Sequence, residues 1–271
     1  DRQAMLALFR RYRFDAVVHT AAALSLSIRA RPALAADVNL GGTVNLLEAA
    51  RETGLRRFIF ASSTTVCYPI FHRPQSGPIK EDFAFHSVSE RPGSLYAASK
   101  LGGEFFVQHY ADQFRMSVAI LRYSAVLGLW AGPNNSVPGR LMKALLGEAA
   151  RGEPVRLTDP LLLWAQGEDF IDARDVARAN VAALDAPSLP GRVYTIASGR
   201  MATVTDFVAA AQGLRPDLSF EPPVPVTTGF AGFAYPRSVP FDVSRARDEL
   251  GFEAMHDLIS SLRAAMPFVQ P

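Results

Sequence analysis

Two side chains on one short stretch of the sequence could move a proton. Tyr96 and Lys100 lie four residues apart in Tyr96-Ala97-Ala98-Ser99-Lys100, so they share one face of a helix. A free tyrosine has a pKa near about 10 and is a poor base at neutral pH, but a nearby ammonium lowers that pKa. Such a tyrosine can take a proton from a substrate hydroxyl while hydride leaves the same carbon, or return it in the reverse reaction.

A cluster of hydroxyl side chains precedes this pair in the sequence. Ala61-Ser62-Ser63-Thr64-Thr65-Val66 follows an apolar segment, and Ser63 is the candidate to hold the same substrate oxygen. Either feature alone is weak, because a Tyr-Lys pair also occurs on solvated helix faces and Ser/Thr runs often cap helices. Their order carries more weight, since the cluster ends a strand and the Tyr96 helix leads into the next one.

The scaffold that must position these residues alternates apolar strands with helices. The pattern predicts strands over residues 14–19, 57–61 and 117–122, and helices over residues 2–11, 32–52 and 94–114. Continuous apolar strands between long helices are typical of an α/β fold with a doubly wound parallel sheet, which helices bury on both faces. Ligands lie beyond the carboxyl ends of such strands, so the loops after Val18, Ala61 and Leu121 should line one crevice.

After about Gly128 the pattern loosens into shorter elements and frequent prolines. We expect a smaller α/β lobe there, with helices over residues 139–151, 173–185, 203–213 and 244–250.

Composition excludes several classes of function. The 271 residues suit one large domain or two intimate lobes, and the net charge of +2 gives no case for nucleic acid as a partner. No apolar run reaches the roughly 18 residues of a membrane span, so we expect no membrane partner. The single cysteine, Cys67, permits no internal disulfide, which fits a reducing compartment and a cytoplasmic location. The five histidines are scattered, and no spacing indicates a metal site.

Seven segments, in order along the chain, resemble the extended short-chain dehydrogenase/reductase family, which includes nucleotide-sugar epimerases and dehydratases. They span residues 15–22, 38–50, 60–66, 96–104, 169–177, 193–197 and 241–252. The resemblance implies that residues 1–128 form the remainder of an NAD(P)-binding Rossmann-type domain. It implies that residues 129–271 form mainly a substrate-binding lobe, with segments near 169–198 returning to the Rossmann sheet.

The same resemblance implies roles for individual residues. Ser63, Tyr96 and Lys100 take the catalytic roles. NAD or NADP, with NAD favoured, would contact Thr20, Ala21, Ala22, Asn39, Ser62, Tyr96, Lys100 and Ser124. The small-molecule substrate, expected to be a sugar derivative, would contact Ser63, Thr64, Asn135 and Arg237. A homodimer is implied through the helices at about 32–52 and 94–114.

The chain departs from the family at its beginning. The family opens with a Gly-x-x-Gly-x-x-Gly turn that receives the cofactor pyrophosphate, and no such turn occurs in this sequence. The resemblance therefore implies an N-terminally truncated member, in which the residue that separates NAD from NADP lies outside the chain. A homologue that never bound the cofactor is the alternative.

The positions expected near the substrate are mixed. Glu168 stands where sugar-nucleotide members often carry an arginine that would clamp a diphosphate. Thr64 and Thr65 stand where sugar dehydratases use an acid pair, which argues against dehydration. Three interpretations stay open: an epimerase or oxidoreductase acting on a sugar-like secondary alcohol, a hydroxysteroid-dehydrogenase-like reductase with an apolar substrate, and a non-catalytic scaffold.

Overall fold

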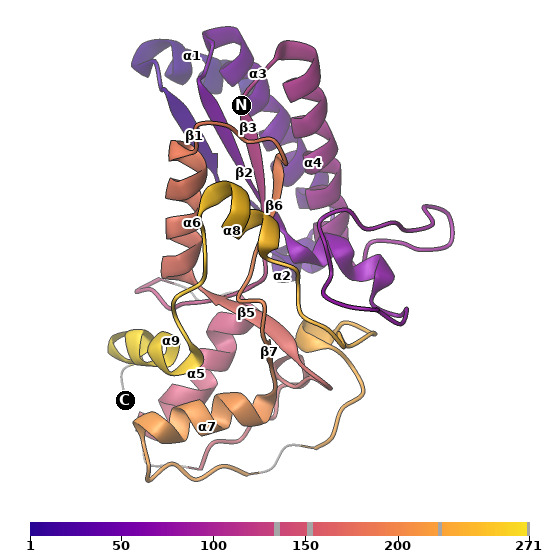
Figure 1. Ribbon diagram of the computed structural model, residues 1–271. Helices are drawn as coiled ribbons and strands as arrows, with labels where there is room; N and C mark the ends of the chain where they lie inside the picture. Colours follow the sequence, from indigo (N-terminus) through magenta and orange to yellow (C-terminus); the bar gives the residue numbers. More distant parts are fainter. Residues whose placement is uncertain (133–135, 151–153, 222–223, 270–271) are drawn as a thin grey trace.

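A parallel sheet forms the upper half of the molecule in Figure 1. The computed structural model describes residues 1–132, 136–150, 154–221 and 224–269. The sheet has the order β1-β2-β3-β6, with β1 at Ala16–His19, β2 at Arg57–Ser63, β3 at Val118–Tyr123 and β6 at Val193–Ile196. Ser62 pairs with Arg122 and Ser63 with Tyr123, so β2 and β3 reach the same level at their carboxyl ends.

Helices cover both faces of this sheet (Figure 1). On one face lie α1 (Arg2–Tyr12), α3 (Gly42–Thr53) and α4 (Leu95–Phe114), and on the other lie α6 (Ala173–Asp185) and α8 (Ser244–Leu250). Alternate residues of β2 feed the two cores: Phe58 and Phe60 pack toward α3 and α4, while Ile59 packs toward α6. The predicted doubly wound α/β fold is therefore confirmed.

The long helix predicted over residues 32–52 is divided in the structure. A short helix α2 (Ser25–Ala30) precedes it, and a π-helical segment η1 (Ala35–Gly41) leads into α3. The wider π turn carries Asn39, whose amide oxygen accepts from the Ala23 backbone N–H at 2.7 Å. Such π segments occur often at functional sites, where they aim one side chain.

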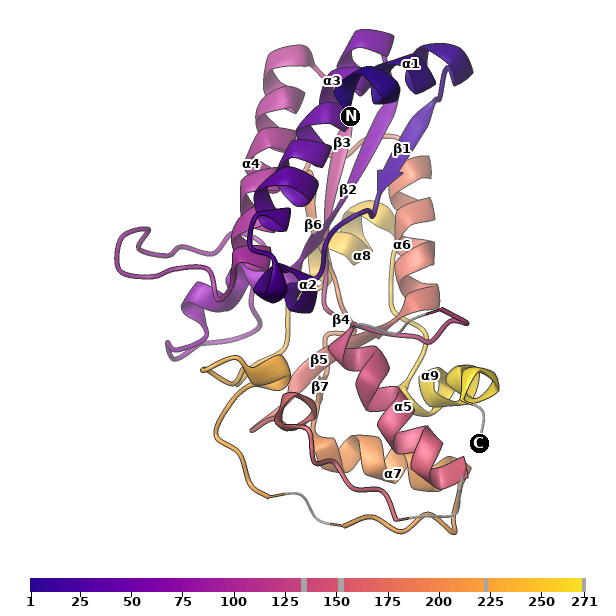
Figure 2. The ribbon, with the colours of Figure 1, turned by 180° about the vertical axis from the view of Figure 1, so that it is seen from behind.

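The smaller lobe is built around a mixed sheet of order β4-β5-β7. Its strands are β4 (Ala125–Leu127), β5 (Glu168–Asp172) and β7 (Met201–Ala202), packed with helices α5 (Val137–Ala150), α7 (Val204–Leu214) and α9 (Leu258–Ala265). Seen from behind, α5 and α9 lie side by side (Figure 2). The pattern did not predict α2 or α9, which are only six and eight residues long.

Edge-to-face aromatic rings fill the core of this lobe. Trp164 meets Phe207 and Phe230 with interplanar angles of 88° and 86°, and Phe170 lies between them. The indole Nε1 donates to the backbone oxygen of Ala202 at 3.0 Å, so the one polar atom of the indole is satisfied.

The chain passes back and forth between the two halves. β3 runs through Ser124 into β4, and the segment 169–198 leads from β5 through α6 to β6. Of that segment, β6 pairs with β3 in the larger sheet, whereas β5 pairs with β4 in the smaller one. The division at residue 128 stays a prediction. Within the described ranges, no helix has the length and apolar character needed to cross a membrane.

Candidate active site

A cavity of about 580 Å³ lies where the strands of the larger sheet end. Its wall includes the end of β2, the first turns of α4, the β3–β4 connection and residues 230–233 of the smaller lobe. Ser63, Tyr96 and Lys100 all line it. The three predicted catalytic residues therefore lie together, as ligand sites do at the carboxyl ends of parallel strands.

Tyr96 sits in the first turn of α4. The side chain of Ser94 caps that turn by accepting from the Ala97 backbone N–H at 3.1 Å. Burial raises the pKa of Tyr96 to about 12, and a hydrogen bond with the Ser63 side chain opposes that rise. The expected lowering of this pKa by lysine is therefore not observed, because burial outweighs it in the protein alone.

The position of the Lys100 side chain explains why its ammonium does not act on the Tyr96 phenol directly. Its Nζ donates to the backbone oxygen of Ala61 at 2.7 Å and lies 5.8 Å from the centre of the Tyr96 ring. Burial lowers the pKa of Lys100 to about 8, and the Glu104 carboxylate acts in the opposite direction. The end of β2 therefore holds the Lys100 side chain, and its ammonium is largely removed from water.

Ser63 is fixed by a local turn. It caps the 3₁₀ segment η2 (Thr64–Ile70), where its Oγ accepts from the backbone N–H of Thr65 at 3.2 Å and from the Thr65 hydroxyl at 3.0 Å. Those bonds leave the Ser63 hydroxyl hydrogen to donate, and in the protein alone it meets the Tyr96 hydroxyl. Thr64, predicted to contact substrate, also lines the cavity.

A buried ion pair joins α4 to β3. Glu104 accepts from Arg122 Nε at 2.9 Å and Nη2 at 2.7 Å, and from the Ser62 hydroxyl at 2.5 Å. Glu104 follows Lys100 by one helical turn, so the same spacing that joined Tyr96 to Lys100 could have marked it as a positioning residue. The Ser62 hydroxyl, predicted to contact the cofactor, is used in this contact instead, although Ser62 also lines the cavity.

The other predicted cofactor contacts divide into two groups. Thr20, Ala22 and Ser124 line the cavity, and the Ser124 hydroxyl is buried without a hydrogen-bond partner among the described residues. Ala21 is not among the lining residues. Asn39 lies behind the wall, where its amide nitrogen donates to Ser99 Oγ at 3.0 Å.

The predicted substrate contacts beyond Thr64 are less central. Asn135 lies outside the described residues. Arg237 is 3% exposed and does not line the cavity, because its guanidinium pairs with Glu168, which does. Phe230 and Phe233 form part of the wall, and nothing in their sequence spacing had indicated this.

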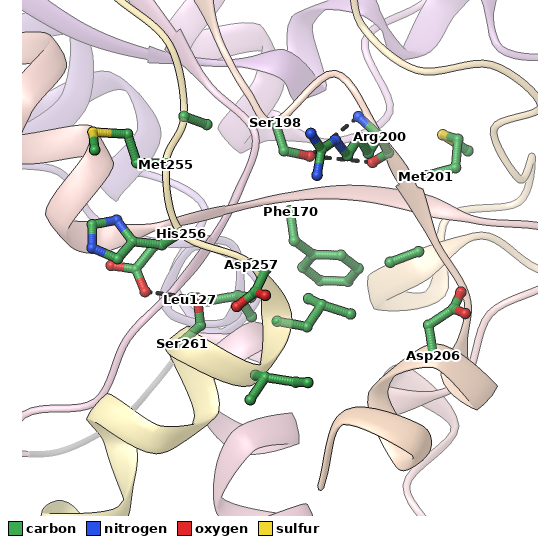
Figure 3. A pocket seen from close by; sticks show the side chains of 15 residues that line it. Leu127, Phe170, Ser198, Arg200, Met201, Asp206, Met255, His256, Asp257 and Ser261 are labelled. Atoms are coloured by element: carbon green, nitrogen blue, oxygen red, sulfur yellow. Dashed lines mark hydrogen bonds between the residues drawn. The ribbon is translucent and has the colours of Figure 1, made fainter. Parts of the chain in front are cut away.

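A second cavity, of about 440 Å³, lies in the smaller lobe between β5, β7, α7 and α9 (Figure 3). Its carboxylates already have structural partners: Asp206 and Asp257 cap α7 and α9, and Asp172 accepts from the Ser261 hydroxyl at 2.7 Å. Across the residues that the structure describes, no group of three or more metal-binding side chains occurs. The 580 Å³ cavity is therefore the candidate active site.

Comparison with known proteins identifies relatives of the whole arrangement. The sequence profile of the NAD dependent epimerase/dehydratase family matches residues 1–197. A UDP-glucuronate 4-epimerase of Thermodesulfobacterium geofontis is 30% identical over 185 residues, which are 67% of this chain and 51% of that protein. An uncharacterized epimerase/dehydratase of Staphylococcus aureus is 26% identical over 278 residues, 100% of this chain and 80% of the relative.

Solved structures share the fold over nearly the whole chain. UDP-glucose 4-epimerase of Thermotoga maritima, in a complex with UDP-glucose, has a TM-score of 0.76 at 25% identity, covering 99% of this chain and 81% of that one. The GalE-like L-threonine dehydrogenase of Cupriavidus necator has a TM-score of 0.79 at 23% identity, covering 100% and 83%. The chain thus spans about half of the first relative and about four fifths of the others.

Proposed function

Because the chain belongs to the NAD dependent epimerase/dehydratase family, we propose that it transfers hydride between NAD and a secondary alcohol of a sugar or sugar-like substrate. The reaction would be an epimerisation or a net oxidation or reduction. The observation that carries this proposal is the convergence of Ser63, Tyr96 and Lys100 on one cavity. Relatives named as epimerases and as a dehydrogenase support keeping both reaction types.

In this mechanism Tyr96 and Ser63 hold the reacting oxygen of the substrate between their hydroxyls. Ser63 turns its hydroxyl hydrogen from Tyr96 to that oxygen, and Tyr96 accepts the hydroxyl proton as the alcohol is oxidised or returns it as the ketone is reduced. Lys100 Nζ donates to Ala61 and lies 5.8 Å from the centre of the Tyr96 ring, so its charge acts on the phenol only at a distance, and this charge falls as pH rises through its lowered pKa of about 8. Thr64 and Thr65 offer no titratable group for the elimination of water.

The cavity fits the nicotinamide end of the cofactor. The unpartnered buried hydroxyl of Ser124 is a polar atom that a bound group could satisfy, and Thr20 and Ala22 continue the same wall. These residues, with Lys100, would hold that end of NAD, which supplies the hydride acceptor when bound.

Replacement of Tyr96 by phenylalanine tests the proposal. The variant keeps the ring and loses the proton carrier, so we expect turnover to fall by at least about a hundredfold, as general acid–base catalysis contributes. Turnover is measured as NADH formation from a panel of sugar and non-sugar secondary alcohols, and NAD binding is measured by calorimetric titration of the same samples.

NAD affinity should stay within about threefold of the wild type, since the phenol acts on the proton rather than on cofactor binding. Ser94→Ala is the matched control: it removes only the cap of α4 and should lower stability by about 1 kcal/mol while retaining most of the turnover. Undiminished turnover in Tyr96→Phe would refute the assigned role. Absence of NAD and NADP binding would instead favour the scaffold interpretation.

A further inference from the structure

An arginine lies buried next to the candidate active site and is already paired with a carboxylate. Arg237 is 3% exposed, and its Nη2 donates to Oε1 of Glu168, the first residue of β5. Its guanidinium also stacks over the Phe241 ring, 4.0 Å from the ring centre. Nε and Nη1 have no hydrogen-bond partner among the described residues. Burial lowers the pKa of Arg237 to about 9, so the guanidinium is still charged at neutral pH.

Glu168 stands between this arginine and the cavity. It lines the cavity wall and Arg237 does not, so the carboxylate covers the guanidinium on the cavity side. Its Oε1 also accepts from the Asp169 backbone N–H at 2.8 Å, which fixes its position at the start of the strand. A guanidinium is the group that best binds phosphate in two-point contacts, and here a carboxylate of the chain itself occupies it.

The remaining wall offers an anion little else. Among the described lining residues the only charged side chains are Lys100 and Glu168, and Lys100 is bonded to Ala61. The remaining wall includes large apolar side chains, among them Leu129, Val137, Phe230 and Phe233. Each Å² of apolar ligand surface that is buried against such a wall stabilises the bound state by roughly 25 cal/mol.

We infer that Glu168 determines substrate class: by occupying Arg237 and facing the cavity, it excludes nucleoside diphosphates and selects an uncharged secondary alcohol with an apolar body. This inference rests on the proposed hydride transfer at the same site, and it replaces the sugar-like substrate of that proposal by an uncharged alcohol with an apolar body. It separates this chain from relatives whose names include a UDP-sugar. Any diphosphate entering the cavity would meet the Glu168 carboxylate before the arginine, and like charges repel.

Calorimetric titration of UDP tests the exclusion without depending on catalysis. We expect no measurable UDP binding to the wild type, because the Arg237 guanidinium is buried and paired with Glu168. Glu168→Gln removes the charge but keeps the shape, and Glu168→Ala also opens the path to Arg237. UDP affinity should therefore rise from wild type to Glu168→Gln to Glu168→Ala, by at least about tenfold overall. Adding Arg237→Met to Glu168→Ala should cancel the gain.

The matched control is Asp159→Asn, which removes another carboxylate paired with an arginine, Arg140, in the same lobe but away from the cavity wall. It should leave UDP binding unchanged. Thermal unfolding of each variant shows whether it is folded. If Glu168→Ala does not fold, UDP binding by Glu168→Gln alone tests the inference. Tight UDP binding by the wild type, or no gain in the folded Glu168 variants, would overturn the inference.

Turnover addresses the second half of the inference. With NAD and the uncharged series propan-2-ol, cyclohexanol and 1-phenylethanol, kcat/KM should increase with apolar size. A flat or falling series would overturn the selection of an apolar body. If no alcohol of any kind is oxidised and NAD does not bind, the proposed function fails instead, and the UDP titrations still decide whether Glu168 excludes the anion.

Discussion

A chain of hydrogen bonds runs from the end of β1 to the turn that carries Tyr96. His19 donates from Nε2 to the Thr43 hydroxyl at 2.9 Å, and Thr43 donates to the Asn39 backbone oxygen at 2.5 Å. Asn39 in turn donates to Ser99, whose hydroxyl donates to the backbone oxygen of Tyr96 at 2.8 Å. Asn39 therefore acts on the site through α4, which differs from the direct cofactor contact that the family resemblance implies.

Protonation of His19 should weaken the fold, because it places a second positive charge in a buried position near Lys100. Burial, together with the charge of Lys100, lowers the pKa of His19 from 6.5 to about 4. Between those two values the unfolded chain binds a proton that the folded protein does not, so the free energy of unfolding falls as pH drops. We expect a loss of roughly 3 kcal/mol between pH about 7 and about 4 that the His19→Asn variant lacks.

Urea unfolding of both proteins across this pH range measures the difference. The carboxyl groups titrate equally in the two proteins, so their contributions cancel when the free energy of unfolding of the variant is subtracted from that of the wild type. Parallel stability curves for His19→Asn and the wild type would show that His19 does not titrate as its burial implies.

At the scale of elements, the contact between α4 and β2 sets the geometry of the site. Gly103 faces the Phe60 ring so closely that a Cβ at this position would lie 2.7 Å from Cζ of that ring. Phe60 is almost fully buried, and its ring lies 5.1 Å from Lys100 Nζ. The absence of a side chain at Gly103 thus lets α4 approach the strand that ends in Ser63.

Replacement of Gly103 by alanine should therefore separate α4 from β2. We expect a loss of about 1–3 kcal/mol in the free energy of unfolding, typical of overpacking, and a lower kcat because Tyr96 and Ser63 move apart. Gly102→Ala is the matched control, since its Cβ would lie an ordinary 3.7 Å from Leu40 and alanine favours the helix by about 0.5–1 kcal/mol. Equal kcat and stability for the two variants would contradict this account of the contact.

These elements also show what the sequence could and could not predict. The apolar strand at β2 and the Tyr96–Lys100 helix follow from local periodicity, which needs no tertiary contact. The π turn at Asn39 depends on a bond to Ala23, and the wall at Phe230 depends on a loop that is brought back from far along the chain. The pairing of Glu168 with Arg237 joins residues 69 positions apart, so no local pattern could indicate it.

At the scale of the whole molecule, the cavity depends on both halves, because the proposed catalytic residues come from β2 and α4 and the aromatic wall comes from the smaller lobe. Large apolar side chains are exposed on α4 and on the segment that packs against it. Phe105 and Phe106 are 53% and 42% exposed, and Val38 of the neighbouring η1 segment is 40% exposed. This face belongs to the helices through which the family resemblance implies a homodimer.

We expect this face to pair two copies of the chain. Sedimentation equilibrium should give a dimer, and Phe105→Glu should weaken it by at least about tenfold, because a charge buried at the interface is not compensated. Val181→Glu is a control on an equally exposed residue of α6, on the opposite side of the sheet, and should leave the dimer intact. A wild type that stays monomeric at about 100 μM would rule out this interface.

The chain's single thiol has a consequence for how the site can be observed. Cys67 is 2% exposed in η2, directly after the Ser63 turn, and burial raises its pKa to about 12. It is therefore almost all un-ionised in the folded protein, and alkylating reagents, which attack the thiolate, can reach it only when the segment opens. The rate at which such a reagent alkylates Cys67 in the native protein therefore measures how often the segment next to Ser63 opens.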